Sequence, residues 1–440
     1  MTLAAAPPSL RHEKVALSGL AAAGCLMLAF SAFAPWIVRT HGYSVFVPLL
    51  AASGLVTIFA TQCAAKVPVR IGLPAIFVLA LAMRLLLVGE EPLLSTDLYR
   101  YIWDGRVQAA GINPYRHVPA DPALAALRDA VIYPRINRAD YAVTAYPPVA
   151  QAFYFIVGRI AESTVAIRLA MVACEAVIVA VVLDLLRRLD LPATAVVAYA
   201  WHPLAVFEIA NNGHVEALMV ALLMAGVWLL VRSRAVAGAI LVALAALAKP
   251  YAVLVLPAFW RPWDWRAPLA VIATIALCYL PYASAGSNVL GFLASGYISE
   301  EGISSGDGIW LTALIQAVTG KLPSLAAIYA VAAAVIMLWL GLRISFRGSE
   351  PPREIVANVV LLLTAGLFLM SPNYPWYFLA LVPFIPLGAG APAWALTIGA
   401  SLLYRPLVLP HNDLVWKSLA TLPFLIVLAA MAWQRLSRRA

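Results

Sequence analysis

Apolar runs of about 20 residues recur along this chain and constrain its fold more than any other feature, because a helix of that length crosses the hydrocarbon core of a bilayer. Hydrophobic residues make up 63% of the 440 residues, and charged residues only 12%. A soluble domain is nearer half apolar and about a quarter charged. We therefore predict an all-α, polytopic integral membrane protein that forms one domain over residues 1–440.

The expected membrane spans number about 12. The first run, Val15–Ala34, follows basic residues and ends in a small-residue pattern, as a signal peptide would. It exceeds the roughly 7–15 residues of a signal-peptide core, so we expect an uncleaved first helix. The spans are predicted at residues 15–34, 44–64, 71–88, 164–186, 193–211, 214–232, 267–283, 323–344, 355–371, 374–388, 391–409 and 415–434.

Short loops between these runs hold many of the basic residues. With the N-terminus in the cytoplasm, these loops and both termini lie on the cytoplasmic side, in agreement with the positive-inside rule. This placement accounts for the net charge of +9, so we expect membrane lipid and no nucleic acid as a partner. The residues concerned are Lys66, Arg70, Arg187, Arg188, Arg232, Arg234, Arg261, Arg266, Arg343, Arg347, Arg353, Arg435, Arg438 and Arg439.

Lys249 and Pro250 interrupt the apolar segment 235–259, which has arginines at both flanks. A single crossing would place Arg261 and Arg266 outside and would reverse every later span. A re-entrant or broken hairpin with Lys249 near its tip keeps the charge rule, and broken helices are tolerated in a membrane where they line a protein cavity. We favour the hairpin, with the single crossing as its alternative.

Two large loops then lie outside the cytoplasm, at about residues 89–163 and 284–322. In the first, residues 97–109 are expected to form a short interfacial helix. This helix should end at Gly111–Tyr115, because Gly and Pro interrupt helices. Tyr146–Pro148 is expected to begin a second apolar piece that lies along the membrane or dips into it.

Charges concentrate in the stretch Asp97–Arg106 of the first outer loop. On a helix that begins near Asp97, residues three, four and seven positions further share its face. This face holds Asp97, Arg100, Tyr101 and Asp104. A carboxylate placed there can take a proton from an attacking hydroxyl, and arginines beside it can stabilise a phosphate leaving group. The alternative is an interfacial helix whose acids and bases pair only with one another.

Polar residues at the outer ends of other spans are candidates for the same site. Arg84, one turn inside the third span, either reaches a ligand or only extends towards the interface. Glu208 lies in an apolar helix, where an acid is a functional hypothesis by default and a structural pairing with an arginine is the alternative. His214 follows in a polar turn beside Glu216, as a ligand or as a capping residue.

Three later positions complete the candidates. Lys249, in the apolar hairpin, either reaches a phosphate or pairs with an acid. Trp376 and Tyr377 lie in an outer turn and either contact substrate or belong to the aromatic belt of the interface. Arg405 is basic on the side where the charge rule disfavours bases, which makes it a candidate for phosphate binding.

The four cysteines lie singly in apolar runs and are interpreted as small packing residues. The sequence contains no histidine or aspartate spacing typical of a metal site. We therefore expect neither a metal nor a cofactor.

Three motifs of the first outer loop, Asp97–Tyr101, Asp104–Arg106 and Gly111–Tyr115, resemble the corresponding loop of the GT-C glycosyltransferases. The most similar branch is that of the bacterial polyprenol-phosphomannose-dependent mannosyltransferases. The resemblance covers about residues 70–410 and is supported by segments 203–216, 248–250 and 375–377. Relatives tend to carry Asn-Asp where this chain has Val215–Glu216.

The resemblance implies an inverting transferase that moves a hexose, with mannose favoured, from a polyprenyl-phosphate donor to a lipid or glycan acceptor. It implies an active site on the periplasmic side of the bacterial inner membrane, with Asp97 as the general base. The residues implied in binding the donor phosphate are Arg84, Arg100, Lys249 and Arg405. Those implied in substrate contacts are Tyr101, Asp104, Arg106, Glu208, His214, Trp376 and Tyr377.

Two other functions fit the same apolar pattern. A transporter or flippase of lipid-linked saccharides would share the spans and the aromatics, but inverted repeats would favour it and the sequence has none that we detect. The large polar first loop favours the enzyme. A glycan ligase or polymerase that uses diphosphate carriers is the third hypothesis. The sequence specifies neither the sugar nor the acceptor.

Overall fold

The computed structural model describes residues 10–320, 325–347, 350–404 and 413–438, in which every regular element is a helix. Nine of these helices are long and apolar enough to cross a membrane, or up to ten when a bent pair counts as one span. The predicted all-α, polytopic membrane fold is confirmed, and the chain is a multi-pass membrane protein.

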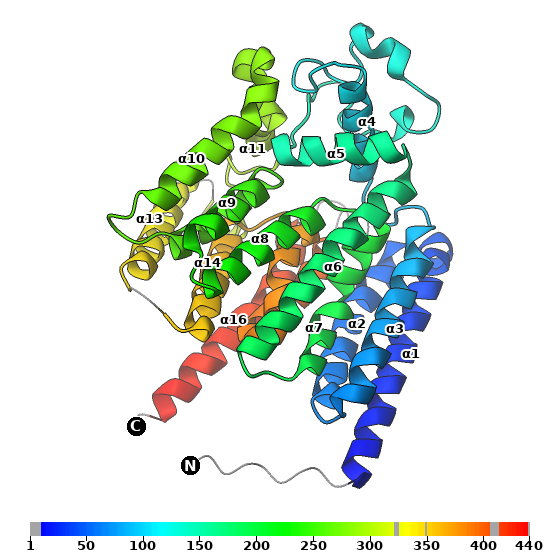
Figure 1. Cartoon of the computed structure of the whole chain (residues 1–440), viewed down its shortest axis with the longest axis vertical. Helices are drawn as coiled ribbons and strands as arrows, with labels where there is room; N and C mark the ends of the chain where they lie inside the picture. The colour runs from blue at the N-terminus through cyan, green and yellow to red at the C-terminus, as the bar shows by residue number, and fades with distance from the viewer. Residues whose placement is uncertain (1–9, 321–324, 348–349, 405–412, 439–440) are drawn as a thin grey trace.

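The N-terminal half forms one side of the bundle and the first outer loop (Figure 1). α1 packs against both α2 and α3. The elements are α1 (Leu10–His41), α2 (Tyr43–Ala64), α3 (Val69–Val88), α4 (Asp97–Ala109), η1 (Pro122–Leu127), η2 (Tyr133–Arg135), α5 (Pro148–Ile160), α6 (Thr164–Arg188), η3 (Ala193–Val196), α7 (Val197–Ala200), η4 (Ala205–Asn211) and α8 (Glu216–Val231).

The C-terminal half continues from the hairpin to the last helix. Its elements are α9 (Ala235–Ala246), η5 (Pro250–Phe259), α10 (Arg266–Tyr279), η6 (Leu280–Leu290), η7 (Leu293–Tyr297), α11 (Ile298–Glu300), α12 (Trp310–Thr319), α13 (Leu325–Ser345), α14 (Pro352–Met370), η8 (Pro375–Phe384), η9 (Ile385–Ala389), α15 (Gly390–Ala400), η10 (Ser401–Leu403) and α16 (Asp413–Ser437).

The number of spans differs from the predicted 12 for two reasons. The predicted span 214–232 forms α8, whose 16 residues are shorter than a typical crossing. The predicted span 374–388 and the first part of the span 391–409 belong to one helical stretch, Pro375–Leu403, while residues 405–409 lie outside the described residues. That stretch turns sharply at Gly388, whose φ of 105° favours glycine, and α15 packs back against η8.

Residues 235–259 form the expected hairpin rather than a single crossing. α9 and η5 pack against each other, with Lys249 in the short connection. A Cβ atom added to Gly238, at the start of α9, would lie 2.7 Å from the ring of Phe259, at the end of η5. The two segments are therefore antiparallel, and Lys249 lies at the tip.

The first outer loop also forms its expected elements. The predicted helix 97–109 coincides with α4, and the second apolar piece becomes α5, which begins at Pro148. α4 and α5 lie at one end of the molecule, opposite to the end at which α1 begins and α16 ends (Figure 1).

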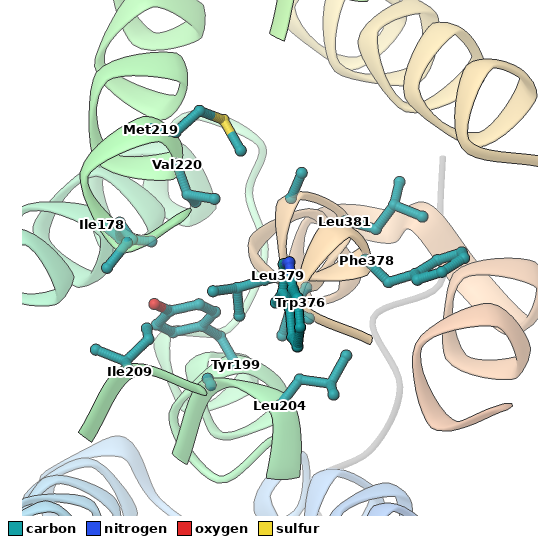
Figure 2. Packing of buried hydrophobic residues seen from close by; sticks show 14 of the residues in the cluster. Ile178, Tyr199, Leu204, Ile209, Met219, Val220, Trp376, Phe378, Leu379 and Leu381 are labelled. Atoms are coloured by element: carbon teal, nitrogen blue, oxygen red, sulfur yellow. The ribbon is translucent and has the colours of Figure 1, made fainter. Parts of the chain in front are cut away.

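The core lies where η8 contacts α7, η4 and α8. Figure 2 shows Trp376 and Leu379 of η8 among side chains from these segments, including Tyr199 and Leu204. Leu379, Tyr199 and Leu204 are fully buried. Close packing of these side chains holds η8 in position. This packing positions the aromatic residues at the start of η8.

A buried ion pair joins three further elements. The Arg84 guanidinium of α3 donates to both carboxylate oxygens of Glu175 in α6, at 2.6 and 3.1 Å. It also donates to the carbonyl of Ala200 in α7, at 2.6 Å. Removing one partner of a buried pair leaves the other charge uncompensated.

We predict that Glu175→Ala destabilises the protein by about 3–5 kcal/mol, because it strands the Arg84 charge among apolar helices. The measurement is the apparent melting temperature of the detergent-solubilised protein. Arg266→Ala removes an exposed ion pair with Asp264 and serves as the control. It should leave the melting temperature nearly unchanged. Equal melting temperatures for the two variants would contradict this role of the Arg84–Glu175 pair.

Candidate functional site

A cavity of about 680 Å³ lies between the two outer loops, the hairpin tip and the start of η8. Its volume is typical of sites for small molecules. Five of the residues predicted from sequence line it: Asp97, Arg100, Lys249, Trp376 and Tyr377. Other polar or aromatic lining residues include Asn137, Arg138, Tyr146, Tyr251, Tyr297, Glu300 and Tyr374.

Asp97 is the first residue of α4 and is partly exposed at the cavity wall. The Asn137 side-chain amide donates to one of its carboxylate oxygens at 2.6 Å. The Tyr146 hydroxyl donates to the other oxygen at 3.3 Å. Two donors from the distal part of the same loop therefore orient this carboxylate.

Arg100 lies one turn further along α4 and is almost fully buried. Its Nε donates to Asp104 at 2.8 Å, and its Nη1 donates to the carbonyl of Ala142 at 3.1 Å. Asp104 does not line the cavity; it also accepts hydrogen bonds from Thr144, at 2.6 Å, and Gln151, at 3.0 Å. This acid thus holds the arginine in position from behind.

Lys249 reaches the cavity from the hairpin tip. Its Nζ lies 2.9 Å from a carboxylate oxygen of the fully buried Glu216, at the start of α8. The rings of Tyr146 and Tyr377 flank the ammonium group, with centroids at 5.3 and 5.5 Å. The acid and both aromatic rings favour a cation at this point of the wall.

A second layer of residues supports the aromatic wall. The His214 ring stacks on Trp376 with centroids 4.2 Å apart, and Trp376 stacks on Tyr374 at 4.4 Å. His214 lies 3.4 Å from Glu208, which also accepts a hydrogen bond from Tyr404. His214 and Glu208 are fully buried and are not among the lining residues.

Three other predicted residues also lie away from the cavity lining. Arg84 donates to Glu175 and does not line the cavity, so in the structure it neither reaches the cavity nor extends towards the interface. Tyr101 is buried and stacks on Tyr154 with ring centroids 4.5 Å apart. Arg106 forms ion pairs with acids of the loop itself: Asp129 at 2.5 Å and Glu162 at 2.9 Å.

The predicted position Arg405 lies outside the described residues. Among the described residues, no group of three His, Cys, Asp or Glu side chains is placed to hold a metal ion.

Arg138 is a lining cation that the sequence analysis missed. Its Nε donates to Glu300 of the second outer loop at 2.6 Å. Burial lowers the pKa of Arg138, but the hydrogen bond to Glu300 and the charges of Glu300 and Asp97 outweigh it and raise the pKa. The charge argument that singled out Arg405, a base on the outer side, applies equally to Arg138. Asn137, its neighbour, is uncharged, so no feature of the sequence singles it out as a site residue.

The second outer loop covers the cavity and contacts both sides of it. The backbone N–H of Phe292 donates to the carbonyl of Thr144 in the first loop, at 3.0 Å. The hydroxyl groups of Tyr297 and Tyr377 lie 2.6 Å apart on the opposite side. Gly291 has a φ of 60°, and a Cβ atom there would lie 2.1 Å from the Thr144 carbonyl oxygen. Only glycine fits this close approach.

We predict that Gly291→Ala pushes the second loop away from Thr144 and speeds amide hydrogen exchange in residues 291–303 by about tenfold or more, since the collision adds to the backbone strain. Gly286→Ala is the matched control. Its φ of 59° imposes the same strain, but its Cβ would meet no atom within 4 Å. Similar exchange rates in both variants would contradict a specific contact between the loops.

The cavity therefore combines three features. One oriented carboxylate, Asp97, can accept a proton. Three cations, Arg100, Arg138 and Lys249, can bind an anionic group such as a phosphate. The aromatic wall offers flat apolar surface to a ring-shaped substrate. Such a set suits the displacement of a phosphate by a hydroxyl group.

Comparisons with known proteins place the sequence among sugar transferases. Residues 14–263 match the family model described as alpha-(1->6)-mannopyranosyltransferase, N-terminal domain. Alpha-(1->6)-mannopyranosyltransferase A of Mycobacterium tuberculosis is 31% identical over 234 residues, which are 53% of this chain and 45% of the relative. The matched region thus spans about half the length of that relative. No solved structure matches the chain significantly.

Proposed function

Because this chain belongs to the alpha-(1->6)-mannopyranosyltransferase family, we propose that it is a membrane mannosyltransferase that takes its sugar from a polyprenyl-phosphate donor. The observation that carries the proposal is the placement of Asp97 in the same cavity as Arg100 and Lys249. A general base and a phosphate-binding group are the two parts that such a transfer requires.

The reaction is a single displacement. The acceptor hydroxyl attacks the anomeric carbon while Asp97 takes its proton. The bond between that carbon and the phosphate oxygen breaks, and the electron pair leaves with the polyprenyl phosphate. Arg100 and Lys249 stabilise the charge that develops on the leaving phosphate. Attack from the side opposite to the leaving group inverts the anomeric configuration, and the base returns its proton to water.

We propose that the active site faces the periplasm of a bacterial inner membrane and that both termini are cytoplasmic. The positive-inside distribution of lysine and arginine supports this orientation. The outer-loop helices α4 and α5 lie opposite to the end at which α1 begins and α16 ends, which agrees with it (Figure 1). A polyprenyl chain would then remain in the lipid while its phosphate enters the cavity.

We expect Asp97→Asn to lower mannose transfer by about 10²–10⁴-fold, because it removes the general base while keeping the shape of the side chain. The assay uses purified protein in proteoliposomes with radiolabelled polyprenyl-phosphate mannose and synthetic α-mannosides. Asp140→Asn is the control, since Asp140 belongs to the same loop but is exposed and does not line the cavity. Full activity of Asp97→Asn beside an active wild type would exclude Asp97 as the base.

The same assay separates the proposal from the diphosphate hypothesis. Wild-type protein should transfer mannose from the monophosphate carrier and not from the corresponding diphosphate. Transfer from the diphosphate alone would favour a glycan ligase or polymerase. Movement of the intact lipid-linked sugar across the vesicle membrane, without transfer, would favour a flippase.

A further inference from the structure

The three cations of the cavity have carboxylate partners of two kinds. Arg100 pairs with Asp104, which is 1% exposed, and Lys249 pairs with Glu216, which is 0% exposed. Asp104 is also bound by Thr144 and Gln151. These two acids cannot leave their cations without stranding a buried charge, so they are fixed parts of the wall.

The nearer carboxylate partner of Arg138, Glu300, differs in both position and exposure, whereas the nearly buried Glu301 lies farther from the guanidinium, at 3.8 Å. Glu300 lies at the end of α11 in the second outer loop, 162 residues further along the chain, and its side chain is 32% exposed. It lines the cavity itself, as Arg138 does. If this carboxylate leaves Arg138 and the Tyr141 hydroxyl that donates to it at 3.3 Å, it can be hydrated, because its side chain already reaches water.

The Arg138 guanidinium is suited to either of two anions. Its fork of N–H groups matches carboxylates and phosphates alike. In the structure it donates to Glu300 through Nε and also contacts the same carboxylate through Nη2. Arg138 lies near the proposed base, because its chain neighbour Asn137 donates to Asp97 and all three residues line the same cavity.

We propose that the Glu300 carboxylate occupies the position on the Arg138 guanidinium to which the donor phosphate binds, and that the phosphate displaces it when the donor binds. This inference rests on the proposed function, because it takes the lipid-linked phosphate as the ligand. Arg138 is then a phosphate-binding residue, and Glu300 is an internal competitor that keeps the two outer loops together until the donor arrives.

The second loop has other anchors that persist when Glu300 moves. Glu301, the next residue, accepts a hydrogen bond from the side-chain amide of Asn373 at 2.6 Å and is nearly buried. Tyr297 contacts Tyr377 on the same side. Donor binding therefore opens the edge of the loop beside Arg138 and leaves the edge beside η8 attached.

The test measures the affinity of proteoliposomes for polyprenyl phosphate, the leaving group, in five proteins. Glu300→Gln should bind it about fivefold more tightly than wild type, because the competing charge is gone. Arg138→Gln should bind it at least about tenfold more weakly. Adding Glu300→Gln to Arg138→Gln should change nothing further, since Glu300 acts through Arg138. Asp307→Asn, an exposed acid in the same loop, should behave as wild type.

Hydrogen exchange gives a second readout that a purely structural ion pair would not move. Saturating polyprenyl phosphate should speed exchange in residues 298–303 of wild type and should have no such effect in Arg138→Gln. The melting temperature of each variant shows that it is folded. A sixth protein, Arg138→Lys, keeps the charge but loses the fork, so its affinity for polyprenyl phosphate should lie between those of wild type and Arg138→Gln.

Unchanged or weaker binding in Glu300→Gln would overturn the inference, as would a gain that persists without Arg138. In both cases the proposed function stands if wild type transfers mannose from the same lipid carrier. If wild type neither binds polyprenyl phosphate nor transfers mannose from its ester, the proposed function fails, and the inference fails with it.

Discussion

Two of the three cations that line the cavity, Arg100 and Lys249, are each held by a buried acid, and the rest of this site depends on these two ion pairs. The pair between Lys249 and Glu216 is the clearest case, because it joins the tip of the hairpin to the first turn of α8. Backbone N–H groups of Val149 and Ala150 in α5 also donate to the carbonyl of Leu247, so the hairpin tip is fixed from two sides. Asp104 does the same for Arg100 within the first loop. Asp104 and Glu216 each pair with a cation, whereas Asp97 forms no salt bridge among the described residues.

The cavity is assembled from segments that are far apart in the chain. α4 supplies the carboxylate, the hairpin supplies the lysine, and the start of η8 supplies aromatic rings. These segments meet because η8 is packed in the core against α7, η4 and α8. The wall of the cavity therefore relies on apolar packing deeper in the bundle, as Trp376 illustrates, because it lines the cavity and also belongs to the core.

The sequence predicted the parts of the fold that have a regular pattern. Helical spacing gave the bounds of α4, and the charge rule predicted the hairpin at residues 235–259. The sequence pattern also placed Lys249 at the tip of the hairpin. It could not predict the pair between Arg84 and Glu175, because these residues lie 91 positions apart in the chain. Asn137 and Arg138 lie in an irregular loop where no periodicity applies, so only the folded chain brings them beside Asp97.

Thr144 belongs to two contacts at once. Its hydroxyl donates to Asp104, the acid behind Arg100, while its carbonyl accepts the backbone N–H of Phe292 from the second loop. The covering loop and the anchored arginine are therefore mechanically linked through a single fully buried residue. The fixed acid behind Arg100 is thus also a fixed point for the covering loop, and a substitution that displaces the Thr144 backbone would disturb the loop and the arginine together.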